Sequence, residues 1–338
     1  MPHQDNRLLE LNAWLEPRLA ELFERRGWGK VPSAALIPAS SDASFRRYFR
    51  WEADGRSLVV MDAPPPQEDC RPFVKVAGLL AGAGLNVPEI AAQELQRGFL
   101  LLSDLGRQTY LDIINEHNAD ALFDDAIRAL IALQQLPVSS PLPAYDEALL
   151  RRELQLFPEW YVQRHLGHCF SPAEQQVWER TCQLLIDSAL KQPTVLVHRD
   201  YMPRNLMFSA PNPGVLDFQD AVIGPVTYDI TSLFKDAFLS WPQERVQRWF
   251  LQYWDSARAA GIPVQGSFDE FQHASDLMGL QRHLKVIGIF ARICHRDGKP
   301  RYLADVPRFF AYIDEVTTRR QELAQLKELL QGLPRVNA

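Results

Sequence analysis

Cysteine is scarce in this sequence and is never arranged in a recognised pair motif. The four cysteines form no CxxC pair, which argues against a zinc site or a dithiol redox centre. They are Cys70, Cys169, Cys182 and Cys294. We interpret them as reduced thiols, the state in which cytoplasmic proteins keep cysteine.

Long apolar runs and an excess of positive charge are also missing. No stretch is apolar over enough residues to span a bilayer, and residues 1–5 lack the start of a secretory signal. The net charge of -6 at pH 7 gives no sign of a nucleic-acid-binding surface. We therefore expect a cytoplasmic protein that binds small molecules, with no membrane, no nucleic acid and no obligate protein partner.

The apolar pattern divides the chain into a β-rich part and a helical part. Residues 1–105 predict a small sheet with helices at 6–27 and 68–81, and strands at 34–38, 45–51, 58–61, 87–94 and 98–102. In residues 106–338 the helical period dominates, with helices expected at 109–135, 145–166 and 172–190, and again up to about residue 332. The pattern is typical of an α+β protein with two lobes.

A β-like island in the helical part carries the strongest chemical signal. Between apolar runs at 194–197 and 206–208, residues 198–205 read H-R-D-Y-M-P-R-N, and V-L-D-F follows at 215–218. This matches the kinase catalytic loop H-R-D-x-x-x-x-N, which is followed by a hairpin and a metal-binding Asp. A polar loop between two buried strands is the alternative interpretation.

Phosphoryl transfer gives this spacing a physical reason. It needs a carboxylate near the acceptor hydroxyl and Mg²⁺ ligands near the β- and γ-phosphates of ATP. We predict that Asp200 is the catalytic base and that Asn205 and Asp217 hold Mg²⁺, with ATP as co-substrate.

The motifs resemble the aminoglycoside phosphotransferase/choline kinase-like family, whose fold is similar to that of protein kinases. Its members often have Asp-Phe-polar-Asp where protein kinases have Asp-Phe-Gly, and residues 217–220 read D-F-Q-D. Residues 224–230, G-P-V-T-Y-D-I, match a second signature of the family. The resemblance implies that His198 supports the catalytic loop and that Asp229 braces it. An ordinary acid near a helix start is the alternative for Asp229.

Other segments narrow the resemblance. The stretches 61–65, 99–106, 217–221 and 296–299 are similar to those of family members that phosphorylate the C1 hydroxyl of amino sugars in peptidoglycan recycling. The resemblance implies N-acetylmuramate and N-acetylglucosamine as acceptors. Arg204, inside the loop, could stabilise the transferred phosphate or contact only a backbone carbonyl.

Nucleotide binding is predicted less directly. Ser40, Ser41 and Ser44 lie in the loop where hydroxyl and N–H groups could meet phosphate oxygens, although a plain hairpin loop fits as well. Ser103, Asp104 and Leu105 resemble the family's hinge, where main-chain groups bind adenine.

The third strand of the β-rich part departs from the family pattern. It reads L-V-V-M-D at 58–62, without the Lys that normally contacts the phosphates and pairs with a helix Glu. Glu68 fits the Glu position, and Arg46, Arg47 or Lys75 could replace the Lys. The missing Lys leaves open a regulator that binds ATP without catalysis.

Two helical stretches are candidates for the acceptor site. In the first, Glu153 could accept sugar hydroxyl protons while Trp160 and Tyr161 stack on sugar rings, or the aromatics could pack in a core. In the second, Gln281, Lys285 and Arg292 share a helix face that suits an anionic acceptor; a solvated cationic face is the alternative. An aminoglycoside or choline-like acceptor stays open.

Overall fold

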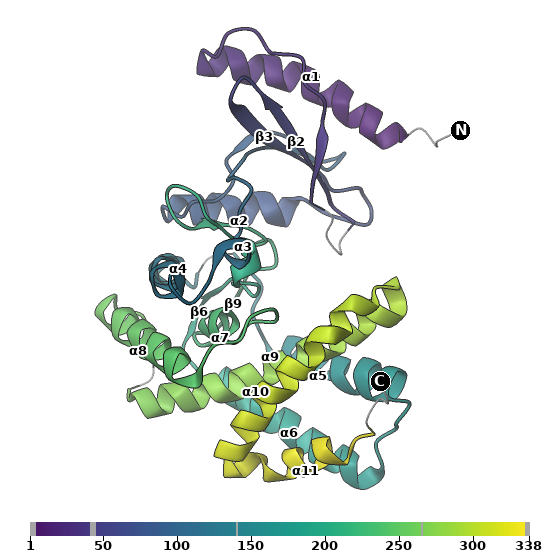
Figure 1. Ribbon diagram of the computed structural model, residues 1–338, viewed down its shortest axis with the longest axis vertical. Helices are drawn as coiled ribbons and strands as arrows, with labels where there is room; N and C mark the ends of the chain where they lie inside the picture. The colour runs from purple at the N-terminus through teal and green to yellow at the C-terminus, as the bar shows by residue number, and fades with distance from the viewer. Residues whose placement is uncertain (1–4, 41–44, 140, 265, 335–338) are drawn as a thin grey trace. The chain divides into compact units, whose positions relative to one another are not determined.

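A computed structural model describes residues 5–40, 45–139, 141–264 and 266–334, and the chain divides into two compact units (Figure 1). Unit 1 consists of residues 1–109 and 206–220, and unit 2 of residues 110–205 and 221–338. The lobe boundary expected at residue 105 falls close to Thr109, and a short hairpin from the second half of the sequence groups with unit 1. Ser41 and Ser44 lie outside the described residues.

Unit 1 is built on a five-stranded sheet with the order β1-β2-β3-β5-β4, in which every pair is antiparallel. Its elements are α1 (Asn6–Arg26), β1 (Ile37–Ser40), β2 (Arg47–Ala53), β3 (Arg56–Asp62), α2 (Arg71–Gly82), β4 (Ile90–Glu94), β5 (Phe99–Ser103) and the hairpin strands β7 (Leu206–Met207) and β8 (Gly214–Val215). The sheet and both helices predicted for this region are confirmed, with ends displaced by a few residues.

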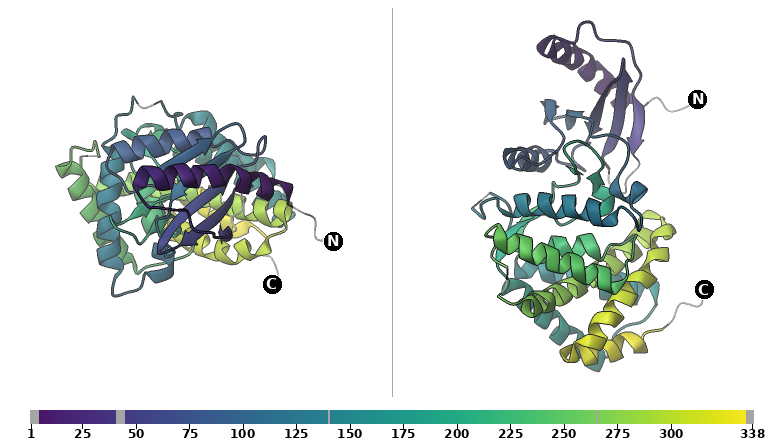
Figure 2. Two further views of the ribbon diagram at one scale, coloured as in Figure 1. Left: turned by 90° about the horizontal axis from the view of Figure 1, so that it is seen from above. Right: turned by 60° about the vertical axis from the view of Figure 1, so that its left-hand side comes forward.

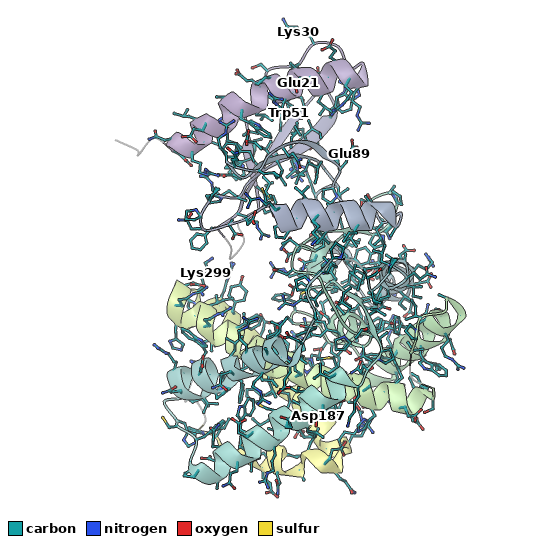
Figure 3. All side chains as sticks on the ribbon, turned by 180° about the vertical axis from the view of Figure 1, so that it is seen from behind. Glu21, Lys30, Trp51, Glu89, Asp187 and Lys299 are labelled. Atoms are coloured by element: carbon teal, nitrogen blue, oxygen red, sulfur yellow. The ribbon has the colours of Figure 1, made fainter. Side chains whose placement is uncertain are left out.

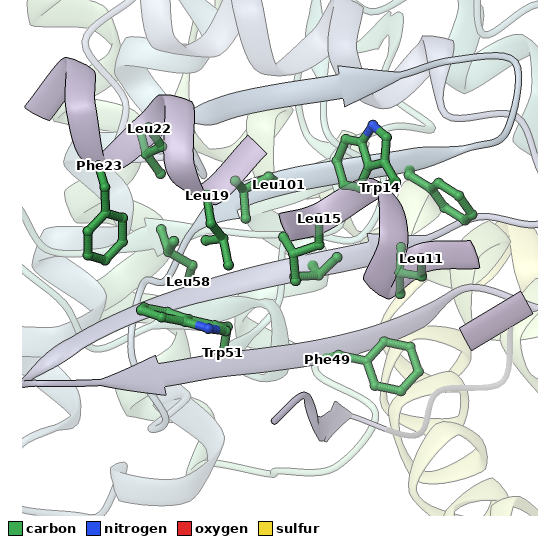
Figure 4. Close-up of a cluster of buried hydrophobic side chains, with 12 residues drawn as sticks. Leu11, Trp14, Leu15, Leu19, Leu22, Phe23, Phe49, Trp51, Leu58 and Leu101 are labelled. Carbon is green, nitrogen blue, oxygen red and sulfur yellow. The ribbon is translucent and has the colours of Figure 1, made fainter. Parts of the chain in front are cut away.

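Helix α1 lies over one face of this sheet (Figure 2). Its leucines meet alternate residues of the strands, as a two-residue side-chain period requires. The buried cluster consists of Leu11, Trp14, Leu15, Leu19, Leu22 and Phe23 from the helix, with Phe49, Trp51, Leu58, Val60, Phe99 and Leu101 from the strands (Figure 4). Trp51, beneath the helix (Figure 3), meets the ring of Phe23 edge-on at a centroid distance of 5.7 Å. Apolar burial on this face therefore defines which strand residues point toward α1 and which point away from it.

Unit 2 is mainly helical. Its elements are α3 (Tyr110–Ile113), α4 (Ala119–Gln134), α5 (Glu147–Leu156), the π-helix η1 (Phe157–His165), α6 (Pro172–Leu190), β6 (Thr194–Val197), the 3₁₀ turn η2 (Pro203–Asn205), β9 (Val222–Pro225), α7 (Tyr228–Phe234), α8 (Gln243–Ala259), α9 (Phe268–Asp297), η3 (Pro300–Asp305), α10 (Val306–Arg319), η4 (Gln321–Leu323) and α11 (Ala324–Gly332). Helix α9 begins with a capping box at Ser267 and Glu270 and ends at Gly298, whose φ is 66°.

Two helix predictions in unit 2 need correction. The helix expected at 109–135 is broken after α3, where the Asn118 side chain accepts a hydrogen bond from the N–H of Asn115 at 2.7 Å. Such local side-chain bonds compete with helical pairing. The helix expected at 145–166 changes to a π-helix at Phe157–Pro158, where proline has no N–H to continue the α-helical ladder.

Candidate functional site

The residues predicted for catalysis occupy a loop of unit 2 that follows β6 and ends with η2, and we call residues 198–205 the catalytic loop. Strand β6 pairs with β9 and is buried from Val195 onward, so the loop starts from a fixed edge. Asp200, the predicted base, is partly exposed. Its backbone N–H donates to Nδ1 of His198 at 3.2 Å. Because Nδ1 accepts, the proton of a neutral imidazole is on Nε2, and His198 stabilises the loop from inside.

Asp229 holds the start of the catalytic loop. It lies in the first turn of α7, fully buried, and its two oxygens accept from the backbone N–H groups of His198 at 2.6 Å and Arg199 at 3.0 Å. Burial raises the pKa of Asp229 to about 7, with a further rise from Asp200, against the lowering effect of the two N–H donors and Arg282. The carboxylate is therefore used for the loop and not for the end of its own helix, whose N-cap residue is Thr227.

The far end of the loop is held by its own side chains. The amide nitrogen of Asn205 donates to the carbonyl of Asp200 at 2.8 Å, which ties the predicted metal ligand to the predicted base. The guanidinium of Arg204 lies 5.3 Å from the centre of the Phe238 ring, so this arginine has an aromatic contact that the sequence did not indicate.

A buried charge network lies next to Asp200 in unit 2. Oε1 of Glu153 pairs with Lys285 at 2.8 Å and with Arg199, and Oε2 accepts from Tyr145 and, at 3.2 Å, from Gln281. Burial raises the pKa of Glu153, but the charges of Lys285 and Arg199 lower it overall, to about 2. The network holds Arg199, whose φ of 76° is in the left-handed region, one residue before the predicted base.

The residues predicted to bind the acceptor differ in how deeply they are buried. Gln281 and Lys285 are buried against Glu153, so they do not form a solvated face, whereas Arg292 is half-buried. Trp160 and Tyr161 are half-buried as well, in the π-helix η1. The Tyr161 ring stacks on Phe157 at 5.5 Å, and burial raises its pKa. Tyr145 was missed because a single tyrosine after a proline-rich linker gives no sequence signal.

Unit 1 contains the residues predicted to bind nucleotide. Ser40 ends β1, and Ser103 ends β5. The Ser103 hydroxyl accepts from the N–H of Glu89 at 2.8 Å. This contact fixes the Ser103 side chain at the start of the predicted hinge. Leu105 is half-buried.

Asp104 of the predicted hinge is held in place by several hydrogen bonds. It accepts from Arg50, from the Ser57 hydroxyl and from the N–H of Gly106. Burial raises the pKa of Asp104, but these donors and the charge of Arg50 lower it overall. Its carboxylate is thus a structural anchor between β2, β3 and the segment that follows β5.

The hairpin of β7 and β8 positions Asp217 in unit 1. Phe218, directly after it, is fully buried and meets Phe73 of α2 at a ring distance of 4.8 Å. Asp217 has a φ of 63°, and its Oδ1 accepts from the side chain of Gln219 at 2.8 Å. A strained backbone beside a buried aromatic is the kind of local arrangement found at functional sites.

The donor set predicted for Mg²⁺ suits that ion chemically. Asp217 supplies a carboxylate and Asn205 an amide oxygen, both hard ligands of the type that Mg²⁺ prefers. No group of three or more His, Cys, Asp and Glu able to hold a metal is found among the described residues. Mg²⁺ commonly uses one or two protein ligands with phosphate oxygens and water, not a cage of side chains.

Comparisons with known proteins agree with this chemistry. Residues 35–264 match the model of the "Phosphotransferase enzyme family". An N-acetylmuramate/N-acetylglucosamine kinase of Pseudomonas putida (strain KT2440) is 68% identical over 333 residues, covering 98% of each chain. Across the helices of the described chain, none is long and apolar enough to cross a membrane.

Solved structures share the fold at low identity. A thermostable mutant of aminoglycoside phosphotransferase APH(4)-Ia has a TM-score of 0.57 at 18% identity, covering 88% of this chain and 98% of that one. Choline kinase LicA from Streptococcus pneumoniae has a TM-score of 0.57 at 12% identity, with the same coverage of 88% and 98%. The family match spans well over half of the sequence. The chain therefore belongs to the phosphotransferase enzyme family.

Proposed function

We propose that this chain is an ATP-dependent kinase that phosphorylates the anomeric C1 hydroxyl of N-acetylmuramate and N-acetylglucosamine. The observation that carries the proposal is the catalytic loop. Asp229 accepts both backbone N–H groups at its start, His198 accepts the N–H of Asp200, and Asn205 donates to the carbonyl of Asp200. The high identity to a kinase with this printed name supports the choice of substrate.

Asp200 has the central chemical role in this proposal. Its carboxylate accepts the proton of the C1 hydroxyl as the sugar oxygen bonds to the γ-phosphorus and the bond to the β-phosphate oxygen of ATP breaks, which releases ADP. The rigid support of the Asp200 backbone keeps the base in place without reorganisation during transfer. His198, Asp229 and Arg204 serve as support for the loop.

Asn205 and Asp217 are the proposed Mg²⁺ ligands. When bound, Mg²⁺ neutralises charge on the β- and γ-phosphates. Adenine is proposed to bind the main chain at Ser103, Asp104 and Leu105, with Ser40, Ser41 and Ser44 serving the phosphates. The described contacts of Ser103 and Asp104 support a rigid hinge.

For the acceptor, the half-buried residues are the best candidates for direct contact. Trp160 and Tyr161 can stack on the sugar ring, and Arg292 can pair with the lactyl carboxylate of N-acetylmuramate. Glu153, Gln281 and Lys285 form a buried network that holds Arg199, the residue before Asp200, and they shape the site in this way. A cytoplasmic role in peptidoglycan recycling follows from this substrate.

The proposal is tested by following ADP release with Mg-ATP and N-acetylmuramate, together with loss of the sugar's reducing end. ADP with loss of the reducing end identifies C1 as the site of phosphorylation. ADP without that loss means another hydroxyl. No ADP with either amino sugar would refute the substrate, and aminoglycoside and choline acceptors would then be assayed, with a regulator that only binds ATP as the remaining class.

The Asp200→Asn variant tests the base. We expect it to lose about 10²–10⁴-fold in kcat, because the amide cannot accept the proton. ATP affinity should be nearly unchanged, since Asp200 is proposed to act on the acceptor. Turnover equal to that of the unmodified protein would rule out this role for Asp200.

A further inference from the structure

Strand β3 contains no lysine and ends at a buried aspartate. Asp62, its last residue, pairs with Arg47 across the β2–β3 ladder. Its carboxylate is fully buried and accepts from Arg47 at 2.9 Å and from Arg7 of α1 at 2.7 Å. Asp62 and Arg47 therefore point to the face that α1 covers. The hydrogen bonds of Asp62 therefore connect helix α1 to the end of β3.

Arg46 points the other way. It precedes β2 by one residue, and because side chains alternate along an extended chain it shares the opposite face with Tyr48 and Arg50. Its side chain is only 14% exposed, and its Nε lies 3.0 Å from Oε2 of Glu68. The other oxygen of Glu68 accepts from the N–H of Phe45 at 3.3 Å. Glu68 therefore contacts two consecutive residues, Phe45 and Arg46.

The guanidinium of Arg46 interacts electrostatically with acidic side chains at the end of the β7–β8 hairpin in unit 1. Burial lowers the pKa of Arg46, but the groups of Tyr48, Glu68, Asp217 and Asp220 outweigh it and raise the pKa. A basic residue, its acidic partner and the Asp of the Asp-Phe pattern are therefore electrostatic neighbours in one compact unit. In kinases, a lysine–glutamate pair and that Asp must be in place together for phosphate binding.

We propose that Arg46 binds the polyphosphate of ATP in place of the missing strand lysine, and that Glu68 is the positioning residue that orients it. This inference rests on the proposed kinase function. A guanidinium presents several donors in a plane and suits phosphate oxygens. The other two basic candidates fit less well, because Arg47 is bound to Asp62 and Asp5, and Lys75 is exposed on α2.

The test compares nucleotide affinities without any acceptor sugar, by titration calorimetry on the full chain with Mg-ATP and with adenosine. For Arg46→Gln we expect ATP affinity to fall by about 10- to 100-fold, the range for a lost charge-assisted hydrogen bond to phosphate. Adenosine affinity should stay unchanged. Arg46→Lys should recover part of the ATP affinity because it keeps the charge, and Glu68→Gln should lose less than Arg46→Gln.

Arg18→Gln is the matched control, since Arg18 is a partly exposed residue of α1 that pairs with Glu21; its ATP affinity should equal that of the unmodified protein. The inference is overturned if Arg46→Gln binds ATP normally, if ATP and adenosine weaken equally, or if Lys75→Gln shows the selective loss instead. If Arg46→Gln does not fold, the selective loss of ATP affinity in Arg46→Lys carries the test. An unmodified protein that binds no ATP would refute the proposed function and this inference with it.

Discussion

Replacing Glu153 with glutamine removes the carboxylate that Lys285 and Arg199 share. Lys285 and Arg199 both pair with this carboxylate, and all three side chains are largely buried. The pKa of Glu153 falls from 4.5 to about 2 in the folded protein, despite the opposing effect of burial, because of these two charges. That difference corresponds to about 3 kcal/mol of stability at neutral pH, at the lower end of the about 3–5 kcal/mol expected for breaking a buried pair.

For a unit of this size, each kcal/mol corresponds to about 2–4 °C, so Glu153→Gln should lower Tm by about 6–12 °C. The sign with pH is defined, since the folded pKa is depressed. The contribution of Glu153 is present above pH 4.5 and is lost as pH falls toward 2. The difference in stability between the variant and the unmodified protein should therefore shrink in acid.

Thermal and urea unfolding at neutral and acidic pH measure both effects. Glu147→Gln is the control on the same helix, because Glu147 is exposed and pairs only at the surface with Arg151, and it should change stability by less than about 0.5 kcal/mol. Adding Lys285→Met to Glu153→Gln should restore part of the loss, since it removes an unbalanced buried charge. A Tm unchanged by Glu153→Gln would show that the network contributes no net stability.

Two further predictions concern Asp229 and Gly288 in unit 2. Burial raises the folded pKa of Asp229 from 3.8 to about 7, so its stabilising contribution is full below pH 3.8 and is lost as pH rises through 7. The urea midpoint of the unmodified protein should therefore fall across this pH range, and that of Asp229→Asn should vary less. Urea midpoints that change with pH in the same way in both proteins would contradict the raised pKa of Asp229. Gly288→Ala would place a Cβ 2.4 Å from the carbonyl carbon of Leu156; we expect a loss of about 1–3 kcal/mol from overpacking, measured by Tm, and an unchanged Tm would mean that α9 can move away.

The sequence identified the elements that local pattern defines. Helix α6 was expected at 172–190 and is found at those residues, because proline and a capping box fix its start and a regular apolar stripe fixes its face. The catalytic loop was predicted because its residue types and their spacing suit the chemistry of phosphoryl transfer. In the structure, Asp229 accepts from the N–H of His198, and His198 accepts from the N–H of Asp200.

Long-range pairing was what the sequence could not supply. Nothing in the pattern of α9 distinguishes a solvated basic stripe from Lys285 buried against Glu153, since the partner is more than one hundred residues away in the sequence. The choice between Arg46 and Arg47 depended on strand register, because neighbours in sequence point to opposite faces of a sheet. Strand β9 was missed because four residues between two loops carry too little signal.

Helix α9 has a consequence for how unit 2 unfolds. It contacts α5, η1, α6, α7, α8, η3 and α10, and its buried residues include Gln281, Arg282 and Lys285. Removing any one of these neighbours would leave apolar and charged surface of α9 in water. The helices of unit 2 should therefore unfold together, and hydrogen exchange in the core of α9 should report the global transition of this unit. A truncation before α10 would be expected to destabilise the whole unit and not merely shorten it.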